Sequence, residues 1–493
     1  MGKKRYAVVG TGSRSSMYIR AITTTYKDVA ELVGLCDSNQ SRMNYYNNVF
    51  LKEQCDSHPD VPTYKADQFD RMIAETKPDV IIVTSMDRTH HKYTCRAMEL
   101  GCDVISEKPM TIDVEKCQQI IDTQKRTGRK LTVTFNYRYA PRNSKVKEVL
   151  QSGIVGEITS VHFEWLLDTS HGADYFRRWH RNKANSGGLM VHKATHHFDL
   201  VNWWLNSEPV TVFAMGDLKF YGKINAEKRG VTEFYQRARN NPIAAKDPFA
   251  LKIDPSNKEM MGLYYNAEAE DGYYRDQSVF GDGIDIEDNM GVMVRYRNNA
   301  VMTYSLCAHC PWEGYRIVFN GTKGRLEFNV VEKRFVEGTS DADLTQFGMR
   351  EMDKDKDGIP PEIVFQPHWG KPQVIEYSCE SLAGHGGGDA KLLKNLFVGV
   401  DEDPLGLAAD FHDGAKSILT GIGANISMKT GLPVKVQELI HWKGFFWEPL
   451  QDGLPLRRGV FCVWETVPAW CRIPREWGAG KGGFFYEKRR LRI

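Results

Sequence analysis

The sequence predicts an α/β protein in which a doubly wound parallel sheet at the N-terminus is followed by an α+β domain with a mostly antiparallel sheet. Over the first 140 residues, short β-rich runs alternate with helical stretches, as in parallel sheets that are covered by helices. After Pro141 the β-rich runs become longer, alternate between apolar and polar residues, and are joined by hairpin-like turns. A chain of 493 residues is long enough for two or three domains.

The first domain is expected to span residues 1–140. Its strands are expected at residues 6–9, 32–36, 80–84, 104–106 and 131–135, and its helices include residues 14–26, 93–100 and 113–127. Gly101 and Gly128 follow two of these helices, at positions where glycine commonly ends a helix.

The second domain is expected to span residues 141–440. A helix up to residue 150 precedes strands that are expected at residues 158–166, 291–296, 301–306 and 316–319. Two polar stretches with weak periodicity, at about residues 223–285 and 331–371, are predicted to be insertions or long loops.

The last 53 residues, 441–493, differ from the rest of the chain. They contain five of the 11 tryptophans and ten Lys or Arg against five Asp or Glu, without a helical or strand period. Two interpretations are open: an irregular extension that packs on the surface or forms an oligomer contact, and a reading-frame artefact with no selected fold. Resistance to limited proteolysis together with the core would exclude the artefact.

Composition excludes several classes of protein. A formal net charge of +2 provides no broad basic face for nucleic acid. No apolar run approaches the roughly 20 residues that cross a bilayer, and the N-terminus passes into a strand-like run without a signal core. We therefore expect a cytoplasmic protein with no nucleic-acid or membrane partner. Ten sparse, irregularly spaced cysteines suit reduced thiols better than a disulfide framework.

A glycine turn links the first predicted strand to the first helix. Gly10 permits a tight turn and Gly12 the close approach of a pyrophosphate, while Ser15 stands at the third glycine of the G-x-G-x-x-G fingerprint. Asp37 ends the second strand 25 residues after Gly12, where a carboxylate can accept hydrogen bonds from an adenosine ribose. The pattern favours a Rossmann-type site for NAD over an ordinary turn and a solvated aspartate.

NADP is the alternative coenzyme. The cations Arg14 and Arg42 lie close to this pattern and could bind a 2′-phosphate. The predicted coenzyme-binding residues are Gly10, Gly12, Ser13, Arg14, Asp37, Arg42 and Glu107.

Lys108 lies in the run Glu107-Lys108-Pro109-Met110 at the end of a predicted strand. Ligands of open α/β sheets bind beyond the carboxyl ends of the strands, so Lys108 is placed to reach the nicotinamide end of a dinucleotide. A single lysine is more often a solvated surface charge. Flanked by Glu107 and fixed by Pro109, it is predicted to donate a hydrogen bond to a substrate oxygen.

A histidine cluster lies within residues 187–205. On one continuous helix His192, His196 and Asp199 would share a face, because four and three residues separate them. His196, oriented by Asp199, is predicted to take the proton of an alcohol as its hydride leaves. A structural histidine cluster and a zinc site are the alternatives. The zinc protease motif needs Glu where this chain has Lys193, so no metal is predicted.

Residues 174–181 mix aromatic side chains with donors, as sugar sites do, although core packing explains some of these aromatics equally well. The run 307–310, with two cysteines around a histidine, resembles a metal or redox pair, but no second C-x-x-C accompanies it. The predicted substrate-binding residues are Tyr137, Arg177, Trp179, His197 and His309.

These motifs resemble the Gfo/Idh/MocA family of NAD(P)-dependent oxidoreductases, which act on sugars, inositols and their derivatives. The similarity extends over about the first 440 residues, and EKPM followed by GGLMVHKATHHFD is its most specific part. It implies a Rossmann domain followed by a domain whose open sheet often mediates dimers or tetramers. It also implies a catalytic group of the EKP lysine and an Asp-x-x-x-His pair, to which Lys108 and His196 correspond.

This chain departs from the family pattern because His192 replaces the expected aspartate. A group that can be neutral or cationic thus stands where the family has a carboxylate. Lys193 could favour a substrate that carries a carboxylate, although we expect it at the surface.

We therefore predict an NAD-dependent oxidoreductase that removes hydride from a secondary hydroxyl of a sugar, glycoside or cyclitol, as a homodimer or homotetramer. Its predicted catalytic residues are Lys108, His196 and His192. One alternative is a redox-neutral hydrolase or lyase in which transient oxidation acidifies the neighbouring C–H and permits elimination, with His192 as an extra acid or base. Another is a non-catalytic dinucleotide-binding protein.

Overall fold

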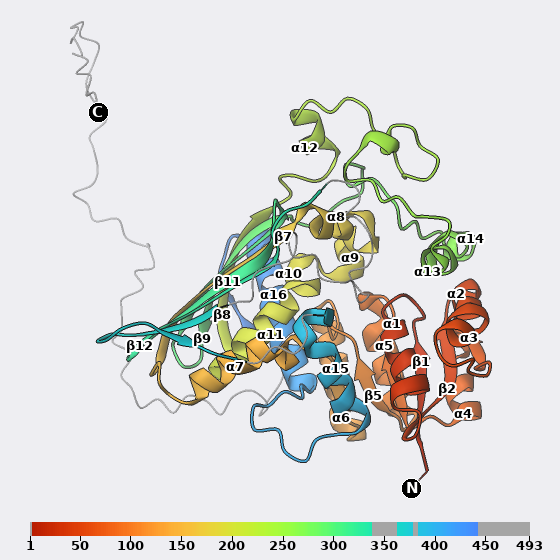
Figure 1. Ribbon diagram of the computed structural model, residues 1–493, viewed down its shortest axis with the longest axis horizontal. Coiled ribbons are helices and arrows are strands. Elements are labelled where there is room, and N and C mark those ends of the chain that lie inside the picture. Colours follow the sequence, from red (N-terminus) through yellow and green to blue (C-terminus); the bar gives the residue numbers. More distant parts are fainter. Residues whose placement is uncertain (1, 338–361, 378–382, 442–493) are drawn as a thin grey trace, which may run out of the picture. The chain divides into compact units, whose positions relative to one another are not determined.

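The computed structural model (Figure 1) describes residues 2–337, 362–377 and 383–441. The chain divides into a compact unit, Met1–His441, and a second unit, Trp442–Ile493. The tryptophan-rich tail, with its two interpretations, lies outside the described residues. Within the described part of the chain, no helix combines the length and the apolar character that crossing a membrane requires.

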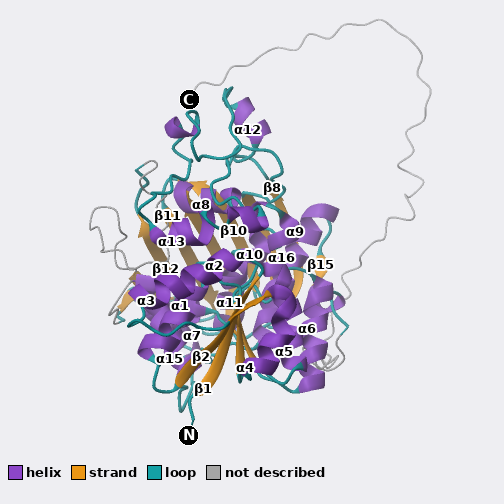
Figure 2. Ribbon diagram, turned by 90° about the vertical axis from the view of Figure 1, so that its right-hand side faces the viewer, coloured by secondary structure: helices purple, strands orange, loops and turns teal. Residues whose placement is uncertain are grey.

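Six parallel strands form the N-terminal sheet in the order β3-β2-β1-β4-β5-β6, which confirms the predicted doubly wound sheet. They are β1 Lys4–Val9, β2 Ala30–Asp37, β3 Thr63–Lys65, β4 Val80–Val83, β5 Asp103–Ser106 and β6 Leu131–Val133. Helices cover the sheet on both sides (Figure 2), among them α1 Ser15–Arg20, α2 Gln40–Tyr45, α5 His90–Glu99 and α6 Val114–Thr127. Strand β3, with three residues, escaped the sequence prediction because it is too short to show a period.

Local sequence explains these elements. All four apolar residues of β4 are buried, as expected for a strand with helices on both faces. The carboxylate of Asp113 accepts from the amide of Lys116 at the start of α6, and Gly128 ends this helix with a φ of 65°. The helix that was predicted at residues 14–26 differs: α1 ends at Arg20 and continues as a π-helical turn, Ala21–Thr25.

Nine strands form the second sheet in the order β14-β13-β12-β11-β7-β10-β9-β8-β15. They are β7 Ile158–Asp168, β8 Pro209–Asp217, β9 Asn289–Tyr296, β10 Val301–Cys310, β11 Glu313–Gly321, β12 Gly324–Lys333, β13 Glu362–Pro367, β14 Gln373–Ile375 and β15 Val434–Lys435. Neighbouring strands are antiparallel except β7 and β10, so the mostly antiparallel sheet is confirmed.

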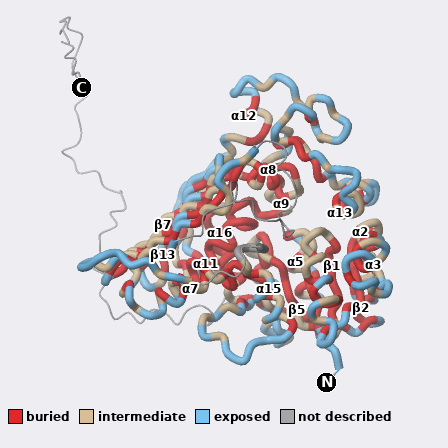
Figure 3. Tube along the Cα trace, in the orientation of Figure 1, coloured by how far each residue is buried: buried red, intermediate tan, exposed pale blue. Residues whose placement is uncertain are grey.

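One face of this sheet is packed and the other faces outward. Helices α11 Ala194–Leu205 and α16 Phe411–Thr430 lie against each other, and α16 packs on β8. Along β9 the residues alternate between buried and exposed, with Val292 and Val294 buried and Met293 half exposed. Figure 3 shows buried residues gathered around α11 and α16, beside these strands.

The polar stretch at residues 223–285, predicted to be an insertion or a long loop, is largely irregular but includes several short helices. It contains α12 Lys223–Lys228, α13 Lys258–Met260, a π-helical turn Met261–Tyr265 and α14 Glu268–Asp271. Leu263 and Tyr264 join the buried cluster that includes Tyr46 and Phe50 of the N-terminal domain. Figure 1 shows α13 and α14 beside α2. In the other polar stretch, residues 338–361 lie outside the described part of the chain.

Two glycines of α16 differ in how closely they approach the chain segment that carries the candidate catalytic histidines. A Cβ at Gly421 would lie 2.2 Å from the carbonyl oxygen of Met190. A Cβ at Gly423, half a turn away, would meet Val212 at an ordinary 3.5 Å. Gly421 therefore lets α16 support the main chain just before His192.

Replacing Gly421 with alanine should lower the free energy of unfolding by about 1–3 kcal/mol, because the methyl group overlaps a main-chain oxygen. Gly423→Ala is the matched control and should be neutral or stabilising by up to about 1 kcal/mol, since alanine favours helix more than glycine does. Urea unfolding of the full chain measures both. Equal effects of the two substitutions would contradict the close approach at Gly421.

Candidate active site

The glycine turn between β1 and α1 has the geometry of a dinucleotide site. Gly10 has a φ of +90°, and a Cβ there would lie 2.4 Å from the amide nitrogen of Ser85. A Cβ on Gly12 would meet nothing within 4 Å, so one side of the turn is open at this residue. A pyrophosphate needs this close access to the main chain, and the residues present therefore fit a dinucleotide.

Ser15 fits the turn although it replaces the third glycine. The side chain is buried, and its Oγ lies 2.7 Å from the carbonyl oxygen of Gly12 and 2.8 Å from Oη of Tyr46. The Tyr46 hydroxyl also donates to the Gly12 carbonyl at 2.8 Å. The serine thus fills the tight space and ties the turn to the helix after β2.

Asp37 fixes the turn from the end of β2. Its Oδ2 accepts from the amide of Thr11 at 2.5 Å and from the Thr11 hydroxyl at 2.9 Å. Its Oδ1 accepts from the amide of Asn39 at 2.9 Å. The predicted ribose ligand therefore lies beside the glycine turn, as its spacing required.

The remaining predicted coenzyme residues are held by carboxylates. Arg14 Nε donates to Glu107 Oε1 at 2.6 Å, which joins the start of α1 to the end of β5. The hydroxyl of Ser13 donates to Glu259 at 2.7 Å, and Arg42 pairs with Asp271 at 2.7 Å. Glu259 and Asp271 belong to the second domain, so Ser13 and Arg42 contact a segment that the sequence did not connect with the coenzyme.

Lys108 lies at the carboxyl end of β5, as predicted, and is not a solvated surface lysine. Its Nζ donates to the carbonyl oxygen of His192 at 3.3 Å. Burial lowers the pKa of Lys108 to about 8, although the carboxylates of Asp87 and Glu107 act in the opposite direction. The ammonium can therefore lose its proton near neutral pH.

The helix that was predicted to carry His192, His196 and Asp199 on one face is interrupted. A short helix α10, Leu189–His192, ends at His192, and α11 begins at Ala194. In a continuous helix the His196 amide would donate to the His192 carbonyl, but here it donates to that of Lys193 at 3.3 Å. The predicted single helix is therefore two helices, with His196 and Asp199 both on α11, and the break presents the His192 carbonyl to Lys108.

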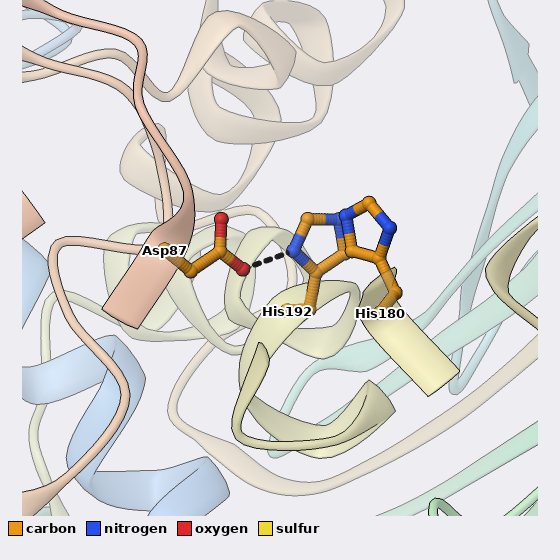
Figure 4. A group of neighbouring side chains, drawn as sticks. All are labelled: Asp87, His180 and His192. Atoms are coloured by element: carbon orange, nitrogen blue, oxygen red, sulfur yellow. Dashed lines mark hydrogen bonds and ion pairs between the residues drawn. The ribbon is translucent and has the colours of Figure 1, made fainter. Parts of the chain in front are cut away.

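His192 belongs to a buried cluster with Asp87 and His180 (Figure 4). Its Nδ1 lies 2.5 Å from Oδ2 of Asp87, and its ring centroid is 4.1 Å from that of His180. Within the described residues, Nδ1 of His180 has no hydrogen-bond partner although the residue is 1% exposed. Orphaned buried nitrogens of this kind are satisfied by water or by a ligand.

Burial drives this pair of groups toward neutral forms. It raises the pKa of Asp87 well above its ordinary value, against the effect of the Lys108 and Arg178 charges. Burial and then the charge of Lys108 lower the pKa of His192 well below its ordinary value. One proton shared at 2.5 Å satisfies both groups, and when Asp87 is ionised Nε2 of His192 is left as an acceptor.

One carboxylate and two imidazoles are also a donor set that a transition metal accepts, and their ligand atoms lie within 4.8 Å of one another. This grouping differs from the His192 and His196 pair that the spacing offered as a zinc site. The positive charges of Lys108 and Arg178 act on both Asp87 and His192 and oppose a bound dication. The arrangement is therefore better suited to proton transfer than to holding a metal.

His196 lies against aromatic rings one turn after His192. Its ring centroid is 4.8 Å from that of Tyr137 and 6.0 Å from that of Phe135, both in edge-on contacts. Asp199 does not orient it: the Asp199 carboxylate is bound by Arg138, with Nε–Oδ2 at 2.8 Å and Nη2–Oδ1 at 2.5 Å. The predicted role of Asp199 was wrong because a distant arginine forms a bidentate pair with it.

The predicted substrate residues divide into two groups. Trp179 stacks on His180 with ring centroids 3.6 Å apart and so lies at the cluster, while Tyr137 contacts His196, one turn after His192. The other three make their contacts elsewhere in the second domain.

Arg177 pairs with Asp174 at 3.3 Å and donates to the carbonyl of Phe249, deep in the domain. His197 stacks on Trp165 at 3.9 Å between ring centroids, in the core under the sheet. His309 stacks on Phe220 and lies 3.6 Å from Sγ of Cys307. Helical and strand spacing could not show on which side of the sheet these residues lie.

Lys193 is buried, which corrects the expectation that it lies at the surface. It is 5% exposed, and its Nζ lies 4.9 Å above the ring of Trp165. Burial lowers the pKa of Lys193, and the nearby charges of Glu313 and Glu332 act to raise it.

Comparison with known proteins identifies the family. One family model, described as an oxidoreductase family with an NAD-binding Rossmann fold, matches residues 4–135, and the model of its C-terminal alpha/beta domain matches residues 147–436. The chain belongs to the Gfo/Idh/MocA oxidoreductase family. The resemblance that the motifs suggested is therefore confirmed.

Three relatives illustrate the similarity. The YteT protein of Bacillus subtilis is 35% identical over 446 residues, which cover 88% of this chain and 98% of YteT. D-glucoside 3-dehydrogenase of Escherichia coli is 29% identical over 154 residues, or 31% of this chain and 41% of that enzyme. The structure of aldose-aldose oxidoreductase from Caulobacter crescentus shares the fold, with a TM-score of 0.55, 18% identity, and coverage of 88% of this chain and 100% of that one.

In this Gfo/Idh/MocA protein, sequence reasoning missed Asp87 and His180. Asp87 follows β4 by four residues, and the rule that placed Lys108 at the carboxyl end of a strand applies to it equally. His180 lies in the aromatic run that was examined for sugar binding, but nothing in its spacing links it to His192.

The structure predicts that Asp199 stabilises the fold. Asp199→Asn removes the charge that compensates buried Arg138, and should lower the free energy of unfolding by about 3 kcal/mol. The matched control is Asp413→Asn: Asp413 pairs with the same guanidinium at 3.3 Å but is partly exposed, and its loss should cost about 1 kcal/mol or less. Chemical denaturation measures both, and equal losses would contradict the structural role of Asp199.

Proposed function

We propose that the protein is an NAD-dependent oxidoreductase that takes hydride from a secondary hydroxyl of a sugar, glycoside or cyclitol. The observation that carries the proposal is the hydrogen bond from Lys108 Nζ to the His192 carbonyl. It brings a donor from the Rossmann sheet to the imidazole cluster of the second domain, beyond the strand ends where such sheets bind their ligands.

The glycine turn would hold the coenzyme. Gly10 and Gly12 offer main chain to the pyrophosphate, and Asp37 stands where the adenosine ribose is expected. Bound NAD supplies the hydride acceptor. The protein positions the reactants and transfers the proton. Glu107, which directly precedes Lys108 in the chain, pairs with Arg14 and thereby connects the glycine turn to the lysine.

Lys108 and His192 divide the proton chemistry. The Lys108 ammonium donates a hydrogen bond to the reacting oxygen and stabilises negative charge there. Nε2 of His192 accepts the hydroxyl proton, and Asp87 fixes the ring through Nδ1 and stabilises the imidazolium that forms. His196, whose described ring contacts are aromatic, bounds the site beside Tyr137.

Two observations support a sugar or cyclitol as the substrate. Aromatic rings, Trp179 and Tyr137, lie beside groups that can hold hydroxyls, a combination that suits the mixed faces of a sugar. The Escherichia coli relative is named as a glucoside dehydrogenase, and the present chain is 29% identical to it over 154 residues.

The experiment that tests the function is a screen of mono- and disaccharides, inositols and 3-keto sugars with NAD, following both NADH absorbance and products. Stoichiometric NADH with a keto sugar supports the proposal. Cleavage of a glycoside without NADH would instead support the redox-neutral hydrolase or lyase, and binding of NAD with no turnover would support a non-catalytic role.

Substitutions distinguish the proposed role of His192 from that of His196. Lys108→Ala and His192→Ala should each lower kcat by about 10²–10⁴, because each removes a group that acts on the transferred proton or on the oxygen. Their Kd for NAD should change little. His196→Ala should lower kcat less than His192→Ala does. A larger loss in His196→Ala than in His192→Ala would indicate that His196 is the base.

The pH profile follows from the lowered pKa of Lys108. Activity in the oxidative direction should fall as the pH rises through about 8, because the ammonium donor becomes a neutral amine. His192, with its pKa below the ordinary range, should be a free base throughout neutral pH. In Lys108→Arg the alkaline decline should move to higher pH, since a guanidinium keeps its proton. An unchanged decline would show that another group titrates there.

A further inference from the structure

We propose that residues 258–272, here named the docking segment, make the site select NAD against NADP. The inference rests on the proposed function, which places a dinucleotide at the glycine turn. The docking segment belongs to the second domain but lies on the N-terminal domain next to Asp37, and it brings two carboxylates to the position where NADP would carry its 2′-phosphate.

Apolar contacts fix the docking segment in place. Met260, Leu263 and Tyr264 are buried in one cluster with Tyr45 and Tyr46 of the N-terminal domain. The approach is close, because a Cβ on Gly262 would lie 2.3 Å from the ring of Tyr45. The carboxylates that follow are therefore carried by a packed element rather than by a free loop.

Polar contacts set the register of the docking segment against the end of β2. Asn39 Nδ2 donates to the carbonyl of Ala267 at 2.9 Å, and Asn39 also bonds to Asp37 through its amide. Arg42 Nε donates to the carbonyl of Leu263 at 3.0 Å. The docking segment is thus bonded to the N-cap residue of α2 and to a residue in its first turn.

Glu270 accepts hydrogen bonds from donors that lie close to the end of β2. Its carboxylate accepts from the amides of Gln40 at 2.8 Å and Ser41 at 2.7 Å, from the Ser41 hydroxyl at 2.6 Å, and from Lys65 Nζ at 2.8 Å. Desolvation would raise the pKa of Glu270, but these hydrogen bonds lower it to about 2, so the group is ionised at neutral pH. A phosphate would have to displace this carboxylate.

Arg42 is the cation that the sequence left open for a 2′-phosphate, and acidic groups hold it. Its Nη2 lies 2.7 Å from Asp271, and its Nη1 lies 3.8 Å from Asp37. Arg42 and Lys65 thus face three carboxylates, those of Asp37, Glu270 and Asp271. The contacts at this end of the site sum to a net negative charge.

The consequence differs for the two coenzymes. A ribose 2′-hydroxyl is neutral and can donate to a carboxylate, so the adenosine of NAD suits this end of the site. A 2′-phosphate adds about two negative charges beside carboxylates that are already ionised, and like charges at such distances repel strongly. Asp37 alone would disfavour NADP, and Glu270 and Asp271 add to this effect and neutralise the cations that could oppose it.

Titration of the full chain with NAD and NADP, followed by calorimetry, tests the proposal without any sugar substrate. The wild-type Kd for NADP should exceed that for NAD by roughly a hundredfold or more, and the 2′-phosphate of 2′,5′-ADP should likewise weaken its binding relative to ADP. In Glu270→Gln combined with Asp271→Asn, the Kd for NADP should fall by at least about tenfold while that for NAD changes less than about threefold.

Glu268→Gln is the matched control. Glu268 belongs to the same helix α14, but its carboxylate pairs with Arg237 and Arg239, away from Asp37. This variant should keep the wild-type preference for NAD. If the double variant fails to fold, Asp271→Asn alone decides: it releases Arg42 from its carboxylate partner and should lower the Kd for NADP relative to that for NAD, and an unchanged preference would overturn the proposal.

Each outcome of the titration has a distinct meaning. Equal wild-type affinity for both coenzymes, or a double variant with the wild-type preference, would overturn the selective role of the docking segment and leave the proposed function standing. Binding of neither coenzyme would overturn the proposed function and this inference together. A shift of preference in the Glu268→Gln control would show that net charge, rather than the position of Glu270 and Asp271, sets the preference.

Discussion

The burial of one ammonium group, that of Lys108, is the constraint on which the arrangement of the site depends. An isolated buried ammonium is costly, and the cost falls only when neighbouring groups accept its protons and balance its charge. Glu107 balances the charge, Asp87 does so when it is ionised, and the carbonyl of His192 accepts a hydrogen bond. These groups come from the ends of β4 and β5 and from the break between α10 and α11. Satisfying Lys108 therefore requires the second domain to lie against the Rossmann sheet.

The same constraint links the coenzyme turn to the imidazoles. Glu107 pairs with Arg14 at the start of α1, and Lys108 follows it directly in the chain. At the other side of the turn, Gly10 packs on the main chain of Ser85, two residues before Asp87. The strands involved, β1, β4 and β5, are neighbours in the sheet, so their carboxyl ends meet at one edge. A displacement of any one of these strands would therefore move the residues at the ends of the other two.

Local signals were sufficient for the parts of the site that depend on one strand end. The positions of Gly10, Asp37 and Lys108 followed from a turn, a spacing and the carboxyl end of a strand, and the parallel sheet followed from apolar runs such as that of β4.

The pairs that join distant parts of the chain could not be predicted in this way. Arg138 and Asp199 are 61 residues apart, and their pairing separates Asp199 from His196. A periodic pattern also continues through residue 193, so it gave no sign that the helix breaks there. The docking segment lies within residues 223–285, which were predicted to be an insertion or a long loop because their periodicity is weak, yet its apolar residues reach the N-terminal core.

The histidine at position 192, where the resemblance to the family implies an aspartate, makes physical sense only together with Asp87. A carboxylate at position 192 would stand next to that of Asp87 in a buried place, where two like charges cannot both remain ionised. An imidazole there forms a short hydrogen bond with Asp87 instead, at 2.5 Å, and keeps a second nitrogen for proton transfer. His180 and Trp179, which stack on each other, meet the His192 ring edge-on and add no further carboxylate. Lys108 consequently lies near the carboxylates of Asp87 and Glu107 without a third one at position 192, and burial lowers its pKa far enough for the ammonium to exchange its proton. Residues 87 and 192 thus act as a matched pair, and neither side chain can be understood from its own position in the sequence.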